Sequence, residues 1–119
     1  MNTHETINYV EFPCCDLNKS KAFFTAVFNW QFTDYGPEYT AFSKEHSGLD
    51  GGFFQANLKS DVTTGSALIV FYSDDLESTE KKIKQHGGII NEATFSFPGG
   101  RRFHFKDPSQ NEFAVWSDK

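Results

Sequence analysis

The chain has 119 residues, of which 38% are hydrophobic and 17% aromatic, a composition that supports one domain with a core of rings and argues against disorder. Its formal charge of −5 at neutral pH excludes the basic surface that nucleic acids and anionic membranes attract. No apolar run approaches the ~20 residues that cross a bilayer, and the opening MNTHETINY lacks the apolar stretch of a signal peptide. We therefore expect a cytoplasmic protein with neither a nucleic-acid nor a membrane partner.

The first half of the chain predicts one strand, one helix and three further strands. The strand is INYVEFP, and Asp16 is the N-cap candidate of a helix over LNKSKAFFTAVFNW. Apolar residues form a wide stripe along that helix, which is typical of a helix packed on a sheet. Three short strands follow in WQFTDY, YTAFSKE and LDGGFFQ, and the polar segment 57–66 is expected to be a loop.

Two adjacent cysteines, Cys14 and Cys15, follow the first strand. Neighbouring Cα atoms lie ~3.8 Å apart, below the ~4.4–6.8 Å of ordinary disulfides, so we expect free thiols. Free thiols suit a reducing compartment.

The second half of the chain repeats the order of the first. ALIVFYS predicts a strand, and Asp74 or Asp75 caps the helical segment LESTEKKIKQH. Gly87 and Gly88 end that helix, as glycine after a helix C-terminus does. Strands are then expected in IINEATFSF, RRFHFKD and EFAVWS.

Superposing the two predicted helix starts gives an offset of 59 residues, which indicates an internal repeat. We call residues 5–56 module one and residues 67–118 module two. A single module cannot cover both faces of its sheet, so we expect the two to form one α+β domain over residues 1–119.

The tandem repeat, the opening YVEFPCCDLNKSKAFFTAVFNWQF and the closing FPGGRRFHFKDPSQNEFAVWS together resemble the vicinal oxygen chelate superfamily. That superfamily includes glyoxalase I, extradiol dioxygenases, and the fosfomycin- and bleomycin-resistance proteins. The resemblance implies two tandem βαβββ modules that form a curved mixed sheet around a cup, with the helices outside, and a homodimer. In one departure, DPSQN places Gln110 at a position of positive φ that relatives give to glycine. A one-residue slip there would exchange the faces of the last strand.

In metal-using relatives, a divalent ion in the cup is held by the first strand of each module and by the last strand. Carried over residue by residue, these positions fall on Tyr9, Leu68 and Ala114, and a further one falls near a glycine of GLDGGFF. A divalent site needs three or four N, O or S donors at ~2–2.3 Å, and leucine and alanine side chains have none. We therefore expect no metal ligands and no cofactor, unless a divalent metal has been displaced to other residues.

Strand residues alternate between two faces, which separates a core face from a cup face. The alternation in RFHFK is the clearest strand signal of the chain. With the phenylalanines toward the helices, the cup face mixes cations, carboxylates and rings, as small-molecule pockets do. The residues predicted to bind a small organic ligand are Tyr9, Glu11, Tyr39, Leu68, Val70, Tyr72, Arg102, His104, Glu112, Ala114 and Trp116.

Glu11 has two interpretations. It orients a ligand or acts as a general base with His104 as the acid, or it forms a structural ion pair with Arg102 or His104, which we favour. Catalytic residues are therefore unassigned, with Glu11 and His104 as candidates. The preferred function is a metal-free protein of bleomycin-resistance type that binds a small organic molecule. The alternatives are a glyoxalase-type lyase or isomerase, and a cup that serves only dimerisation.

Overall fold

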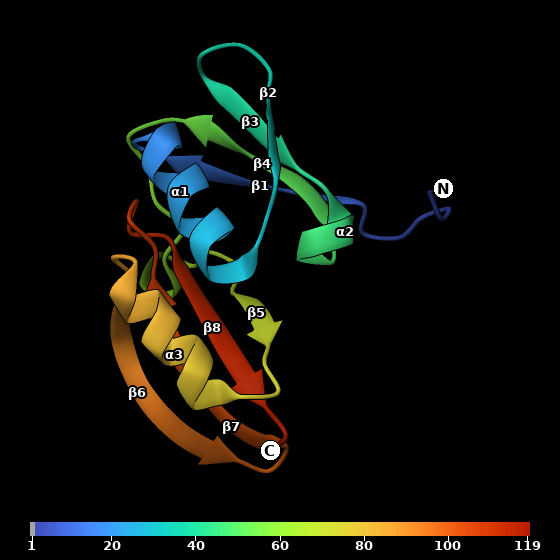
Figure 1. Ribbon diagram of the computed structural model, residues 1–119. Coiled ribbons are helices and arrows are strands. Elements are labelled where there is room, and N and C mark those ends of the chain that lie inside the picture. Colours follow the sequence, from blue (N-terminus) through green and yellow to red (C-terminus); the bar gives the residue numbers. More distant parts are fainter. Residues whose placement is uncertain (1) are drawn as a thin grey trace.

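The computed structural model describes residues 2–119 and contains two four-stranded sheets and three α-helices (Figure 1). A single turn of 3-10 helix, η1, lies within the predicted loop. The elements are β1 (Tyr9–Cys14), α1 (Leu17–Phe28), β2 (Phe32–Asp34), β3 (Tyr39–Phe42), α2 (Lys44–Ser47), β4 (Asp50–Gln55), η1 (Val62–Thr64), β5 (Ile69–Tyr72), α3 (Leu76–Gln85), β6 (Ile89–Phe97), β7 (Gly100–Lys106) and β8 (Glu112–Ser117).

The two modules have the same topology. Sheet one has the strand order β1-β4-β3-β2, and sheet two has the order β5-β8-β7-β6. In each sheet the first strand of the module pairs in parallel with the last, and the other pairs are antiparallel. This arrangement confirms the predicted α+β fold of two βαβββ modules. It adds that within one chain the eight strands form two separate sheets.

Local capping explains where the two long helices begin and end. The Asp16 side chain accepts a hydrogen bond from the Lys19 N–H at the start of α1, and Asp75 accepts one from the Ser78 N–H at the start of α3. The structure thus selects Asp75 over Asp74 as the second cap. After α3, Gly87 has a φ of 97°, a conformation that glycine adopts without strain.

The short helix α2 was not predicted. The sequence YTAFSKE was expected to be one strand, but β3 ends at Phe42. The Ser43 side chain accepts a hydrogen bond from the Glu45 N–H, so it caps a new helical turn, which ends at Gly48 with a φ of 89°. Serine is a good N-cap residue, and its capping hydrogen bond starts the helix in place of a longer strand.

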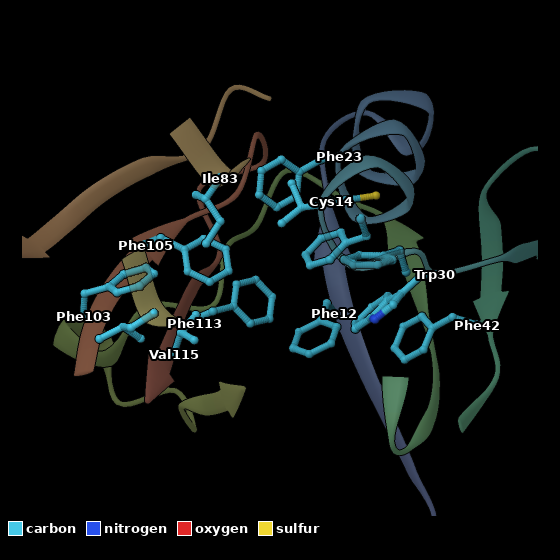
Figure 2. Close-up of a cluster of buried hydrophobic side chains, with 14 residues drawn as sticks. Phe12, Cys14, Phe23, Trp30, Phe42, Ile83, Phe103, Phe105, Phe113 and Val115 are labelled. Atoms are coloured by element: carbon cyan, nitrogen blue, oxygen red, sulfur yellow. The ribbon is translucent and has the colours of Figure 1, made fainter. Parts of the chain in front are cut away.

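The hydrophobic core lies between the two sheets, which flank it in Figure 2. The ring centroid of Phe113 lies 5.2 Å from that of Phe12, 5.5 Å from Phe24, 5.8 Å from Phe71 and 5.4 Å from Phe105. These rings come from β1 and α1 of module one and from β5, β7 and β8 of module two. Because the core-facing sides of both sheets point toward each other, the opposite sides, which we call the outer faces, point away from one another.

The turn DPSQN fastens the last strand to module one. Gln110 has a φ of 71°, so it takes the positive φ that the resemblance implies for this position although it is not a glycine. The Asn111 side chain is fully buried, and its Nδ2 donates to the Pro13 carbonyl at 2.7 Å while its Oδ1 accepts from the Ser60 N–H at 2.8 Å. These bonds fix the entry to β8, and Phe113 then points into the core, as the unslipped register requires. Among residues 2–119, no helix is long and apolar enough to cross a membrane.

Candidate functional site

The outer faces of the sheets carry the residues that alternation assigned to the cup. On β1, Val10 and Phe12 pack in the core, whereas Tyr9 and Glu11 are exposed on the other side. On β3, Phe42 packs in the core, so the residue before it, Ala41, faces outward. The two outer faces do not meet within one chain.

The outer face of module one holds a chain of three hydrogen-bonded side chains. The Tyr39 hydroxyl donates to Glu11 Oε2 at 2.9 Å, and the hydroxyl oxygens of Tyr9 and Tyr39 lie 2.5 Å apart. We had expected Glu11 to pair with Arg102 or His104. The structure gives it Tyr39 instead, because those two residues lie on the other sheet.

A glycine makes room for this arrangement. Gly52 of β4 lies opposite Glu11 and Ala41 in the sheet, and a Cβ atom on Gly52 would overlap the Tyr39 hydroxyl. The Tyr39 ring therefore occupies the space above Gly52. Burial raises the pKa of Tyr39, and the hydrogen bonds with Tyr9 and Glu11 raise it further, so the phenol stays protonated.

A cavity of about 600 Å³ opens beside these phenols. It extends from the outer face of sheet one to the loop between β2 and β3 and to α2. Its walls include the residues Tyr9, Phe32, Tyr35, Tyr39, Glu45 and Asp50. A volume in this range accommodates a small organic molecule.

The outer face of module two holds a buried polar network. His104 Nδ1 lies 3.0 Å from Glu112 Oε2, and His104 Nε2 lies 2.9 Å from Arg102 Nη2. A guanidinium only donates, so Nε2 accepts, and Nδ1 carries the proton that it donates to Glu112. Both ring nitrogens of His104 are therefore engaged.

Glu112 is a carboxylate held by donors. Its Oε1 accepts from the Val62 N–H at 3.3 Å, and its side chain is almost fully buried. Burial raises the pKa of Glu112, but the hydrogen bonds from His104, Asn91 and Val62 outweigh that effect and leave the pKa below its ordinary value. Glu112 thus remains ionised beside His104.

Aromatic rings surround this network. The Arg102 guanidinium lies 5.6 Å from the centre of the Phe95 ring, and its Nε is buried without a hydrogen-bond partner in residues 2–119. The Tyr72 hydroxyl donates to Asp118 Oδ1 at 2.6 Å, and its ring meets that of Trp116 edge to face. This face is therefore a ring-rich wall with an embedded cation.

The apolar candidates are placed differently from one another. Leu68 immediately precedes β5 and is half-buried, and Val70 is exposed on the outer face. Ala114 is fully buried, with Val70 and His104 as its neighbours on the adjacent strands. The structure thus brings together the candidates of each module, but it does not bring Tyr9 near Leu68 or Ala114 in one concavity of a single chain.

Comparison with known proteins decides the family. A model of the Glyoxalase/Bleomycin resistance protein/Dioxygenase superfamily matches residues 6–115. The chain belongs to this superfamily. No curated protein matches the chain in sequence.

Solved structures of superfamily proteins share the fold at low sequence identity. An enzyme of the glyoxalase/bleomycin resistance protein/dioxygenase family from Burkholderia phytofirmans PsJN is 15% identical, with a TM-score of 0.77, and the match covers 95% of this chain and 98% of that one. The fosfomycin resistance protein FosX from Listeria monocytogenes is 19% identical, with a TM-score of 0.74 and coverage of 98% and 94%. Lactoylglutathione lyase from Agrobacterium tumefaciens is 17% identical, with a TM-score of 0.70 and coverage of 98% and 96%. At these identities the likeness extends to the fold alone.

The residues of this superfamily member do not fit the metal that the fold implies. Leu68 and Ala114 have no donor atoms, and the Tyr9 hydroxyl is hydrogen-bonded to Tyr39. Among residues 2–119, no three His, Cys, Asp or Glu side chains converge as a metal site requires. The nearest group of donors, His104 and Glu112, is already engaged by Arg102 and by the Val62 amide.

Sequence reasoning missed several walls of the module-one cavity. Phe32 begins β2 and Tyr35 follows that strand, while Glu45 lies in the unpredicted helix α2 and Asp50 begins β4. Phe32 and Asp50 are the first residues of their strands and Glu45 lies in a helix, so the face assignment made along β1 and β3 did not extend to them. The density of rings and carboxylates between residues 32 and 50 was the available signal.

Proposed function

We propose that the chain binds a small organic molecule, without a metal ion, in a cup that two copies of the chain build together. The observation that carries the proposal is the pair of outer faces, each of which combines polar groups with exposed rings and lies uncovered in one chain. Four large apolar or aromatic side chains on these faces are between 37% and 50% exposed, namely Tyr9, Val70, Tyr72 and Phe95. Exposed apolar surface of this kind marks binding sites and interfaces.

In a homodimer, the outer face of one module would be covered by an outer face of the partner copy. A two-fold arrangement would set the module-one face of one copy against the module-two face of its partner, twice. The charges support this pairing, because Glu11 stands on the first face and Arg102 on the second. A ligand would then lie between phenols from one copy and the Arg102 wall from the other.

A binding function is preferred over a lyase or isomerase. In the proposed dimer, Glu11 of one copy and His104 of the other would face the same cup. Glu11 is already hydrogen-bonded to Tyr39, and both ring nitrogens of His104 are engaged by Glu112 and Arg102, so His104 has no free nitrogen for acid–base chemistry on a ligand. The proposed location is the cytoplasm, where the free thiols of Cys14 and Cys15 stay reduced.

The first test is the assembly. We expect a dimer by sedimentation velocity, and we expect Val70→Glu to make the protein monomeric because it places a charge on the proposed interface. The matched control is Lys81→Glu, which changes an exposed residue of α3 on the core side of its sheet and should leave the dimer intact. A monomer in the unmodified protein would contradict the proposed cup.

The second test is ligand binding with and without metal. A small-molecule library is tested by thermal shift in the presence of a chelator, and metal content is measured on the purified protein. We expect ligands that raise Tm equally with and without the chelator. A divalent ion bound in stoichiometric amount, whose removal abolishes the ligand-induced shift, would overturn the metal-free proposal.

A further inference from the structure

The hydrogen bonds of the Tyr9–Tyr39–Glu11 chain run in one direction. A carboxylate only accepts, so the Tyr39 proton is donated to Glu11 Oε2. The Tyr39 oxygen must then accept the proton of Tyr9 across the 2.5 Å contact. Both phenol protons are used inside the chain, and only lone pairs remain for a ligand beside Tyr9. The group that docks there must be a hydrogen-bond donor.

The negative charge of the cavity favours a cationic group, which can also be a hydrogen-bond donor. Its lining residues include Glu45 and Asp50 but neither lysine nor arginine, and His46 is the only basic type among them. Asp50 Oδ1 accepts the Lys44 backbone N–H at 2.7 Å, which holds that carboxylate in place. No ion pair within residues 2–119 neutralises Glu45 or Asp50. A cation entering the cavity would meet uncompensated negative charge.

The rings around the cavity add a third feature. Tyr9, Tyr35, Tyr39 and Phe32 all contribute to its walls, and Tyr35 is 64% exposed. Aromatic faces attract cations, by ~0.5–2 kcal/mol for each favourable contact. Lone pairs, negative charge and ring faces therefore converge on one volume of about 600 Å³.

We propose that this cavity selects an organic amine in its protonated form, with the ammonium N–H groups directed at the Tyr9 oxygen and the carbon skeleton against the rings. The inference rests on the proposed function for the presence of an organic ligand, and it specifies the ligand class. The cation Arg102 stands on the other face. The ammonium end of the ligand thus belongs at module one.

The test compares four probes that share a benzyl or phenyl group: benzylammonium, benzyltrimethylammonium, benzyl alcohol and benzoate. Binding is followed at millimolar concentration through the amide resonances of residues that line the cavity. Benzylammonium should bind most tightly, and added salt should weaken it. Benzyltrimethylammonium, which keeps the charge but has no N–H, should bind more weakly. Equal or tighter binding of benzyl alcohol or benzoate at these residues would overturn the proposal, as would the failure of benzylammonium to shift them.

Two variants separate the contributions. Tyr9→Phe removes the acceptor and should weaken benzylammonium about tenfold, as expected for a hydrogen bond to a charged group, while leaving benzyltrimethylammonium nearly unchanged. Glu45→Gln should weaken both cations. Its matched control is Glu80→Gln, a helical glutamate of α3 that pairs with Lys84 outside the cavity and should change neither. Equal weakening of both cations by Tyr9→Phe would refute the role of its oxygen as the acceptor.

Failure of this inference is distinguishable from failure of the proposed function. The cavity lies wholly within module one, so amine binding by a monomer would retain the inference and refute the dimeric cup. Metal-free binding of a neutral or anionic library compound at the same residues, with no preference for benzylammonium, would retain the proposed function and refute the inference.

Discussion

The outer faces of the two modules have the same strand topology but different chemistry. On module one, Glu11 is exposed, bonded to a phenol, and adjacent to an open acidic and aromatic cavity. On module two, Glu112 is buried and bonded to an imidazole and a backbone amide. The repeated topology therefore fixes where the strands lie but not the exposure or the hydrogen-bond partners of the side chains on them.

The difference follows from the strand pairs. In module one, Gly52 leaves an empty position into which the Tyr39 ring can lie, so the face stays open and phenolic. In module two, the corresponding face is filled by His104 and its neighbours, which cover Ala114 completely. One face keeps an open cavity, and the other is filled by its own side chains.

The largest expected effect comes from removing a side chain of the core that the two modules share. Phe113→Ala should lower the free energy of unfolding by ~3–5 kcal/mol, because it leaves a cavity among rings from both modules.

Trp30 lies in the core of module one and Trp116 on module two, so the fluorescence of single-tryptophan variants reports the unfolding of each module separately. Coincident denaturation curves are expected, and two separated transitions would show that the modules unfold independently.

The matched control for this prediction is Phe95→Ala, on the outer face of module two, where the ring is 37% exposed. It should cost less than ~1 kcal/mol. A loss as large as that of Phe113→Ala would mean that the outer face contributes to the core.

An intermediate effect should distinguish the two glutamates directly. In the parent protein, the His104 Nδ1–H and the Val62 N–H each donate to a different oxygen of Glu112. Glu112→Gln keeps only one oxygen, so one of these donors loses its acceptor and the free energy of unfolding should fall by ~1–3 kcal/mol. Glu11→Gln keeps an acceptor for Tyr39 at an exposed site and should cost less than ~0.5 kcal/mol. Urea denaturation of both variants at neutral pH measures the contrast, and equal losses would remove the distinction between the faces.

A pH dependence is expected in the turn that joins the modules. Burial raises the pKa of Asp107 to about 6, although the Ser109 and Asn111 N–H groups donate to it. Because this pKa lies above the ordinary ~3.9, the contribution of Asp107 to stability is complete below about pH 4 and is lost as pH rises through about 6. Its slope is at most ~1.4 kcal/mol per pH unit.

Comparison with Asp107→Asn isolates this contribution. Glu112, whose pKa is lowered, acts in the opposite direction, since its contribution is lost on acidification. The stability difference between the parent protein and Asp107→Asn should therefore be followed from pH 7 to pH 4, where it should shift in favour of the parent. A difference that does not change with pH would show that Asp107 titrates normally in the folded protein.

Much of the fold follows from local signals in the sequence. Asp16 and Asp75 cap their helices because a carboxylate satisfies free N–H groups wherever the chain turns into a helix. The alternation of RFHFK places Phe103 and Phe105 in the core and the side chains between them on the outer face, as strand geometry requires. The absence of donor atoms at Leu68 and Ala114 is likewise a property of the side chains themselves. These features depend on residues a few positions apart, so the sequence by itself determined them.

Only the tertiary structure decided which distant residues meet. Glu11 accepts a hydrogen bond from Tyr39 and does not pair with Arg102, because the two sheets pack their inner faces on a shared core and their outer faces point apart. The cavity beside Tyr9 depends on the empty position above Gly52 and on α2, neither of which strand alternation describes. Contacts across 28 or 30 positions of sequence are set by how sheets pack, and that packing is a property of the whole core rather than of any one segment.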